Sequence, residues 1–147
     1  MKRRMFKPLG LLLFIGFLWI DTSLAEINSI RVSSRLDPNS ITITEVDIVF
    51  IYDADIASNF PSTKSAWYSG KFMFTRTAGA AIDIVNIFIP QGFDFVDAIL
   101  PERKDQAIRV VVFTQHDDSK AQPIDITELV DVLVEIDPFG IIVSSTN

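Results

Sequence analysis

Apolar and polar residues alternate over short segments of this chain, and turn-forming residues recur about every ten positions. The segments are rich in Ile, Val, Phe and Thr, which favour strands. We predict strands over 27–35, 41–52, 71–75, 81–89, 107–114, 124–136 and 141–144, with 93–100 as either a strand or an irregular edge. Since each sheet must cover its apolar face with another layer, the pattern predicts an all-β fold, a small two-sheet β-sandwich.

The predicted strand at 41–52 has an unusual pattern. Val46, Ile48 and Phe50 lie on one face, whereas Val49 and Ile51 make the far end apolar on the other face as well. We therefore expect a central strand whose second face is covered by a further layer. The predicted strand at 107–114 is also expected to be central.

Segment 124–136 fits two patterns. Alternating valines from Val130 to Val134 are typical of a strand, whereas Leu129 and Leu133 belong to a helical stripe. The density of β-branched residues favours the strand.

Residues 53–69 break the strand pattern. Pro61 is followed by Ser62 and Thr63, either of which is suited to capping a helix, so we predict a long connection with about two turns of helix. Its aromatic residues have two possible roles, covering the open end of the sandwich or anchoring a protein partner. They are Phe60, Trp67 and Tyr68.

The N-terminal segment differs from the rest. Four basic residues among the first seven precede an uncharged apolar run of twelve residues, 9–20. A polar segment then brings small residues, Ser23 and Ala25, to the positions that signal peptidase accepts. We predict a cleaved signal peptide over 1–25, a single sandwich domain over 26–147, and a periplasmic or secreted location.

An uncleaved membrane anchor is the alternative for this segment. Twelve helical residues span about 18 Å, less than the hydrocarbon core of about 30 Å, which favours cleavage. The adjacent Arg3 and Arg4 leave both the general and the twin-arginine export routes open. The sequence contains no cysteine, so we expect no lipidated cysteine, and the means of tethering is left open.

Charge and composition exclude several classes of function. The N-terminal segment takes four of the 13 basic residues and one of the 19 acidic ones, leaving nine and 18, a net charge of −9. An acidic surface argues against nucleic acid as a partner. The lack of cysteine also removes thiol nucleophiles, thiolate metal sites and disulfides, so the core alone must stabilise the domain.

Candidate catalytic groups are few. The one histidine, His116, precedes Asp117 and Asp118, a set suited to a base or a metal site but equally typical of a solvated loop, which we favour. Two acidic pairs offer oxygen atoms to calcium but lack the spacing of a known loop. They are Asp53 with Asp55, and Asp94 with Asp97. We predict a protein that is not an enzyme and has no metal or cofactor.

Several motifs occur in a characteristic order. A turn at 36–39 (LDPN) precedes the strand motif at 46–53 (VDIVFIYD), and the aromatic helical connection follows. Next come a turn at 89–92 (IPQG) and a Val-rich strand ending in Phe at 107–113. This order and spacing, from about residue 36 to 118, resemble the TssJ family, the outer-membrane lipoprotein component of type VI secretion systems.

The resemblance implies a transthyretin-like β-sandwich with a helical excursion. It also implies a periplasmic scaffold that binds the periplasmic part of the inner-membrane TssM component. In that family the turn between the first two strands is the partner loop. Here the equivalent residues are Asp37, Pro38, Asn39 and Ser40. The missing lipid-bearing cysteine is the major departure, and it leaves a soluble variant or a neighbouring family such as secretion pilotins open.

Other functions remain as alternatives. One is a periplasmic or secreted module that binds a ligand or glycan, or a small hydrolase, since two carboxylates suffice for glycoside hydrolysis. Another is an adhesin or pilus-like subunit. The secretion-scaffold hypothesis predicts seven partner-binding residues: Asp37, Pro38, Asn39, Ser40, Phe60, Trp67 and Tyr68.

Overall fold

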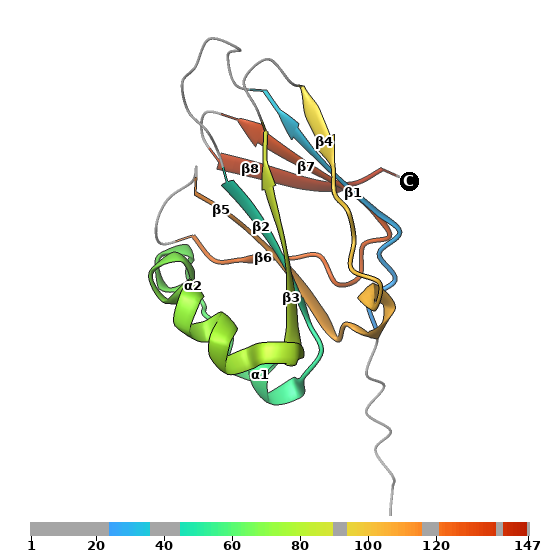
Figure 1. Cartoon of the computed structure of the whole chain (residues 1–147). Coiled ribbons are helices and arrows are strands. Elements are labelled where there is room, and N and C mark those ends of the chain that lie inside the picture. Colours follow the sequence, from blue (N-terminus) through green and yellow to red (C-terminus); the bar gives the residue numbers. More distant parts are fainter. Residues whose placement is uncertain (1–23, 36–44, 90–93, 116–120, 138–139, 147) are drawn as a thin grey trace, which may run out of the picture.

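The computed structural model describes residues 24–35, 45–89, 94–115, 121–137 and 140–146, and its strands form two sheets (Figure 1). The first sheet, in the order β4-β1-β7-β8, consists of β1 (Ser29–Ser34), β4 (Phe95–Asp97), β7 (Asp131–Asp137) and β8 (Gly140–Ser145). The second, in the order β3-β2-β5-β6, consists of β2 (Glu45–Ile51), β3 (Ile82–Phe88), β5 (Arg109–Thr114) and β6 (Ile124–Asp125). The prediction of an all-β two-sheet sandwich is confirmed.

The pairing also confirms the central strands. β2 lies between β3 and β5, and all pairs in this sheet are antiparallel. In the other sheet β1 runs parallel to β7 and antiparallel to β4. The ambiguous segment 124–136 is not helical, but it is not one strand either: it supplies β6 to one sheet and most of β7 to the other, with a turn over 126–130 between them.

The main core lies between the sheets and follows the predicted alternation. Val46, Ile48 and Phe50 of β2 point inward and are fully buried. Ala25 belongs to the same core, with 1% of its surface exposed, and its backbone N–H donates to the carbonyl oxygen of Ala107 at 2.9 Å. Cleavage after Ala25 stays a prediction, and it would remove this contact from the mature domain.

Two helices, α1 (Ala54–Ser58) and α2 (Lys64–Ala78), lie on the outer face of the second sheet (Figure 1). They cover Val49 and Ile51, which confirms the predicted further layer over β2. The hydroxyl of Thr63 caps α2 by accepting from the N–H of Ala66 at 3.2 Å. Gly79, at φ 52°, ends it in a conformation that favours glycine. Short 3₁₀ turns occupy Gly79–Ala81 and Lys104–Gln106.

The predicted strand at 71–75 is wrong, because these residues continue α2. The helix is 15 residues long, well beyond the predicted two turns. The helix does carry a stripe of residues at helical spacing that face the sheet. They are Trp67, Lys71, Phe74 and Ala78. The short-range alternation of aromatic residues within 71–75 imitates a strand and hides that stripe.

Aromatic packing holds α2 against the sheet. The indole of Trp67 stacks on the ring of Phe113 of β5, with centroids 5.2 Å apart and planes 4° from parallel. Phe60, from the connection between the helices, lies 5.4 Å from Trp67 and 5.9 Å from Phe113. Such pairs add about 0.5–1.5 kcal/mol each beyond the area they bury.

A buried carboxylate joins this aromatic cluster to the sheet. Asp47 of β2 has no exposed surface, yet it accepts hydrogen bonds from three side chains. The donors are Trp67 Nε1 at 2.8 Å, Lys71 Nζ at 2.8 Å and Asn86 Nδ2 at 2.6 Å. Burial alone lowers the pKa of Lys71, but its hydrogen bonds to Asp47 and Glu45 outweigh burial and raise the pKa overall.

We expect Asp47→Ala to destabilise the domain by about 2–4 kcal/mol, because it leaves the Trp67 N–H without an acceptor and Lys71 with one carboxylate fewer. The matched control is Asp105→Ala, since that carboxylate is 72% exposed and its loss is expected to change stability by less than about 0.5 kcal/mol. Urea unfolding measures both, and equal losses would contradict the assigned role of Asp47.

Candidate partner-binding surface

The predicted partner loop, Asp37, Pro38, Asn39 and Ser40, lies outside the described residues, but its surroundings are placed. Residues 35 and 45 flank the loop segment. The backbone N–H of Ser34 donates to the carbonyl oxygen of Asp94 at 2.9 Å, and Glu45 pairs with Phe88 across the sheet. The ends of β1 and β3 and the starts of β2 and β4 therefore lie together (Figure 1). We call this part of the sandwich the loop end.

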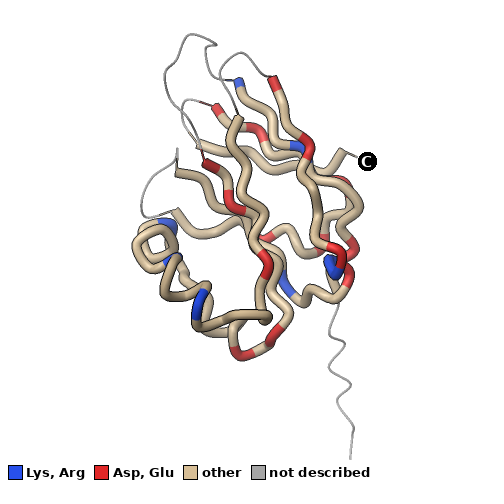
Figure 2. Tube along the Cα trace, viewed as in Figure 1, with Lys and Arg blue, Asp and Glu red and all other residues tan. Residues whose placement is uncertain are grey.

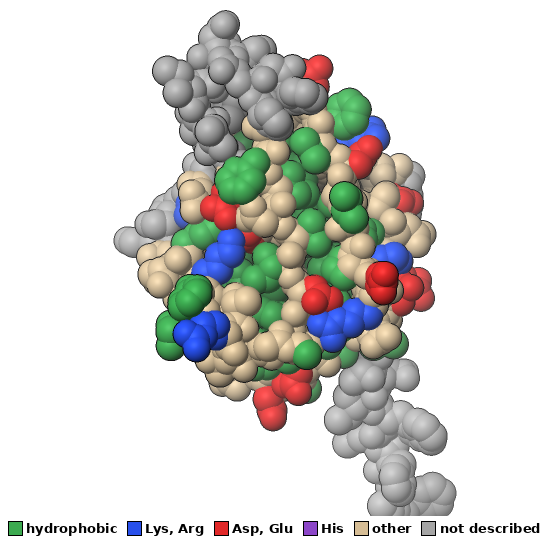
Figure 3. All heavy atoms as spheres, viewed as in Figure 1, with side chains coloured by type: hydrophobic (Ala, Val, Ile, Leu, Met, Phe, Trp, Pro, Cys, Tyr) green, Lys and Arg blue, Asp and Glu red, His purple; other side chains and the backbone are tan. Residues whose placement is uncertain are grey.

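Two large aromatic side chains are exposed at the loop end. Phe88, the last residue of β3, is 52% exposed, and Phe95, the first of β4, is 49% exposed. The guanidinium of Arg31 lies 4.4 Å from the centroid of the Phe95 ring. Figure 3 shows hydrophobic side chains gathered on this part of the surface. Exposed large aromatic side chains are typical of interaction sites.

The sequence-predicted aromatic residues lie elsewhere. Phe60 is 8% exposed, Trp67 has no exposed surface, and Tyr68, on α2, is half-buried. The sequence leaves two roles open for these residues, covering the sandwich or binding a partner. Their contacts are those of residues that cover the sheet. Their binding role stays a prediction, and in this conformation Trp67 offers a partner no surface.

Two of the four acidic candidates have structural partners. The carboxylate of Asp53 caps α1 by accepting from the N–H of Ile56 at 3.0 Å, and Asp97 pairs with Arg31 at 2.6 Å. His116 and its neighbours Asp117 and Asp118 lie outside the described residues. Within the described ranges, no group of three or more His, Asp or Glu side chains is placed to hold a metal ion.

A charged cluster lies at the opposite end of β3. Arg103 donates to both oxygens of Asp83, at 2.8 and 3.0 Å, and its guanidinium lies 3.9 Å from the ring centroid of Tyr52. The Tyr52 hydroxyl donates to Asp83 at 2.8 Å. The hydrogen bonds from Arg103 lower the pKa of Asp83. The pKa of Tyr52 is raised, mainly by burial and then by its hydrogen bond to Asp83. The cluster thus combines an ionised acid with a neutral phenol, and it fastens the chain around residue 103 to β3.

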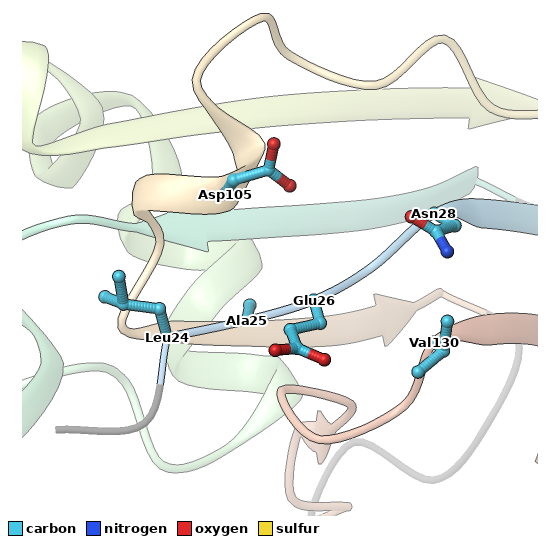
Figure 4. A pocket seen from close by; sticks show the side chains of 6 residues that line it. All are labelled: Leu24, Ala25, Glu26, Asn28, Asp105 and Val130. Carbon is cyan, nitrogen blue, oxygen red and sulfur yellow. The ribbon is translucent and has the colours of Figure 1, made fainter. Parts of the chain in front are cut away.

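A shallow pocket lies where the N-terminal segment passes beside β7 (Figure 4). Its lining carries two carboxylates, Glu26 and Asp105, among apolar and amide side chains. Asp105 is paired with Lys104 at 2.6 Å. The lining holds no hydroxyl or thiol beside a base, so it lacks the nucleophile–base pair that acyl transfer uses.

The described residues define a small two-sheet β-sandwich with a helical layer over one sheet and exposed aromatic residues at the loop end. Solved structures share this architecture. Lip from Serratia marcescens, a membrane-bound component of the type VI secretion system, has a TM-score of 0.51 and 9% identity, over 81% of this chain and 96% of Lip. The type VI lipoprotein TssJ1 from Pseudomonas aeruginosa has a TM-score of 0.50 and 10% identity, over 81% and 95%.

These similarities show that the chain has a TssJ-like fold, as its motif order predicts. No protein-family model matches the chain, and no curated protein is significantly similar to it. Among the described residues, no helix has both the length and the apolar character needed to cross a membrane.

The Asp83 cluster predicts a specific dependence of stability on pH. Because the folded-state pKa of Asp83 is lowered from 3.8, its contribution is complete above that value and is lost as the pH falls through the lower folded-state pKa. We expect Asp83→Asn to lower the free energy of unfolding by about 1 kcal/mol at neutral pH, and by less below about pH 3. Urea unfolding at both pH values tests this, and a deficit that does not shrink in acid would contradict it.

Proposed function

We propose that this chain is a non-enzymatic component of a type VI secretion system that works in the periplasm. The observation that carries the proposal is the fold shared with Lip and TssJ1 over 96% and 95% of their lengths. At 9% and 10% identity this likeness concerns the fold. The motif order from the turn at 36–39 to the strand at 107–113 supports carrying the function over as well.

Its partner, on this proposal, is a TssM-like protein, an inner-membrane component with a periplasmic part. The binding surface is the loop end. In the sequence, segment 37–40 joins β1 to β2, and these strands pair with β4 and β3, which carry Phe95 and Phe88. Half-exposed aromatic side chains suit this role, because each buries a large area on binding and loses little rotamer freedom. The cation–π contact with Arg31 restrains the Phe95 ring before any partner arrives.

The chain's tethering also follows from this proposal. Lip is described as membrane-bound and TssJ1 as a lipoprotein, whereas this sequence contains no cysteine to carry a lipid. We propose that the domain is exported by the signal at 1–25 and then held in the envelope by its protein partner.

Affinity purification of the tagged protein from its own envelope fraction tests the proposal. We expect mass spectrometry to find an inner-membrane secretion component with a periplasmic part. Replacing Asp37 to Ser40 with a Gly-Ser linker should abolish recovery. Phe88→Ser with Phe95→Ser should lower it at least about tenfold, because both anchors are removed.

The control is Phe72→Ser, since Phe72 is 70% exposed and lies on α2, outside the strands that carry Phe88 and Phe95. It should leave recovery unchanged, and thermal unfolding should show that all variants are folded. A free monomer with no copurifying secretion component would overturn the proposal. The search would then turn to glycans and small molecules.

A further inference from the structure

β3 leaves one of its edges open. It pairs with β2 alone, and in the described part of the chain no other backbone hydrogen bond reaches Ile82–Phe88. Natural proteins protect such edges with lysine, proline, bulges or very short strands. β3 has seven residues (IDIVNIF), with neither lysine nor proline. By contrast, the edge strands β4 and β6 have three and two residues.

A shallow groove follows this open edge. One wall is formed by residues 83–85 of β3, and the other by residues 99–103, which lead from β4 back to β5. Its apolar lining comes from Ile84, Val85, Ile99, Leu100 and Pro101. Ile99 is 89% exposed, the highest value among the large exposed apolar side chains. Figure 3 shows hydrophobic side chains along this face. The groove thus lies between β3, at the edge of the second sheet, and the segment that follows β4, at the edge of the first sheet.

An ion pair bridges the two walls of the groove at one end, and β3 leads from the other end to the loop end. The Arg103–Asp83 ion pair fixes its far wall to β3, with Arg103 also packed on Tyr52. At its other end β3 leads to Phe88 at the loop end. An extended chain that contacts the loop end therefore has a direct path along the β3 edge.

The charges around the groove are unbalanced (Figure 2). The nearby arginines are already paired, Arg31 with Asp97 and Arg103 with Asp83. Asp94 beside the loop end and Glu102 on the groove wall are both exposed, and neither makes an ion pair with a described residue. Unpaired negative charge thus lies on the groove wall, at Glu102, and beside the loop end, at Asp94, where it complements basic side chains.

We propose that this groove binds an extended segment of the envelope partner, which adds to the second sheet as a strand beside β3. Main-chain hydrogen bonds to the open edge supply affinity, and alternate apolar side chains pack on Val85 and Ile99. Basic residues of the segment meet Asp94 and Glu102. The proposal rests on the proposed function, since it names how the same partner binds.

Photo-cross-linking in the native envelope tests the groove directly. Ile99 is replaced with benzoylphenylalanine, and the control places the same probe at Ile142. That residue is 47% exposed on β8, the edge strand farthest from β4 in the other sheet. We expect an adduct with the copurifying partner from position 99 alone. The cross-linked peptide should map to one segment with alternating apolar residues.

Hydrogen exchange of the purified complex tests the strand pairing. The backbone amides of 82–88 that face the groove should exchange more slowly in the complex than in the free protein, because they gain acceptors. Ile99→Asp should weaken binding at least about tenfold, because it places a charge in an apolar contact. Ile142→Asp should have no effect.

The outcomes separate this inference from the proposed function. If the secretion component copurifies but position 99 gives no adduct and β3 exchange is unchanged, the groove proposal is overturned and the function stands. If position 99 captures an extended segment of an unrelated protein and β3 becomes protected, the groove proposal stands and the function fails. If nothing is recovered or cross-linked, both fail.

Discussion

The arrangement of this domain depends on one buried carboxylate. Asp47 lies beneath α2 with no exposed surface, where an unpaired charge is very costly. Its three donors come from two elements, Trp67 and Lys71 from α2 and Asn86 from β3. They meet only when the helix lies across the sheet in this position. The carboxylate therefore sets where α2 packs, and the stacked aromatic rings then add the energy of burial.

The position of α2 determines which surfaces remain for binding. The helix covers Val49 and Ile51, so β2 is buried on both faces and the outer face of the second sheet is closed. The sheet's inner face is closed by the first sheet. Of the second sheet, the edges and the loop end remain open, and β3, with seven residues, is a longer edge strand than β6, with two. Both proposed binding features lie there, and neither requires the core to move.

Much of the fold follows from periodicity, because burial on one or two faces leaves a direct mark on the sequence. The apolar residues on both faces of β2 indicate both its central position in the sheet and the helical layer that covers it. The helix at 64–78 is missed at its second half because Phe72 and Phe74 alternate like strand residues, although one faces solvent and the other the sheet. The binding surface is harder to predict. Phe88 and Ile99 look like core residues in sequence, and only the separation of β3 from β4 leaves them exposed.

Strand addition also fits the low sequence identity to Lip and TssJ1, 9% and 10%. An interface built from specific side-chain pairs is lost when those side chains change. A strand edge instead presents N–H and C=O groups that any residue except proline supplies. On this proposal the fold itself retains the main part of the interface, and the side chains of Val85 and Ile99 set only its preference among partners. On the same proposal, such contacts hold a chain that has no cysteine in the envelope, so the open β3 edge is the feature expected to tolerate the least change.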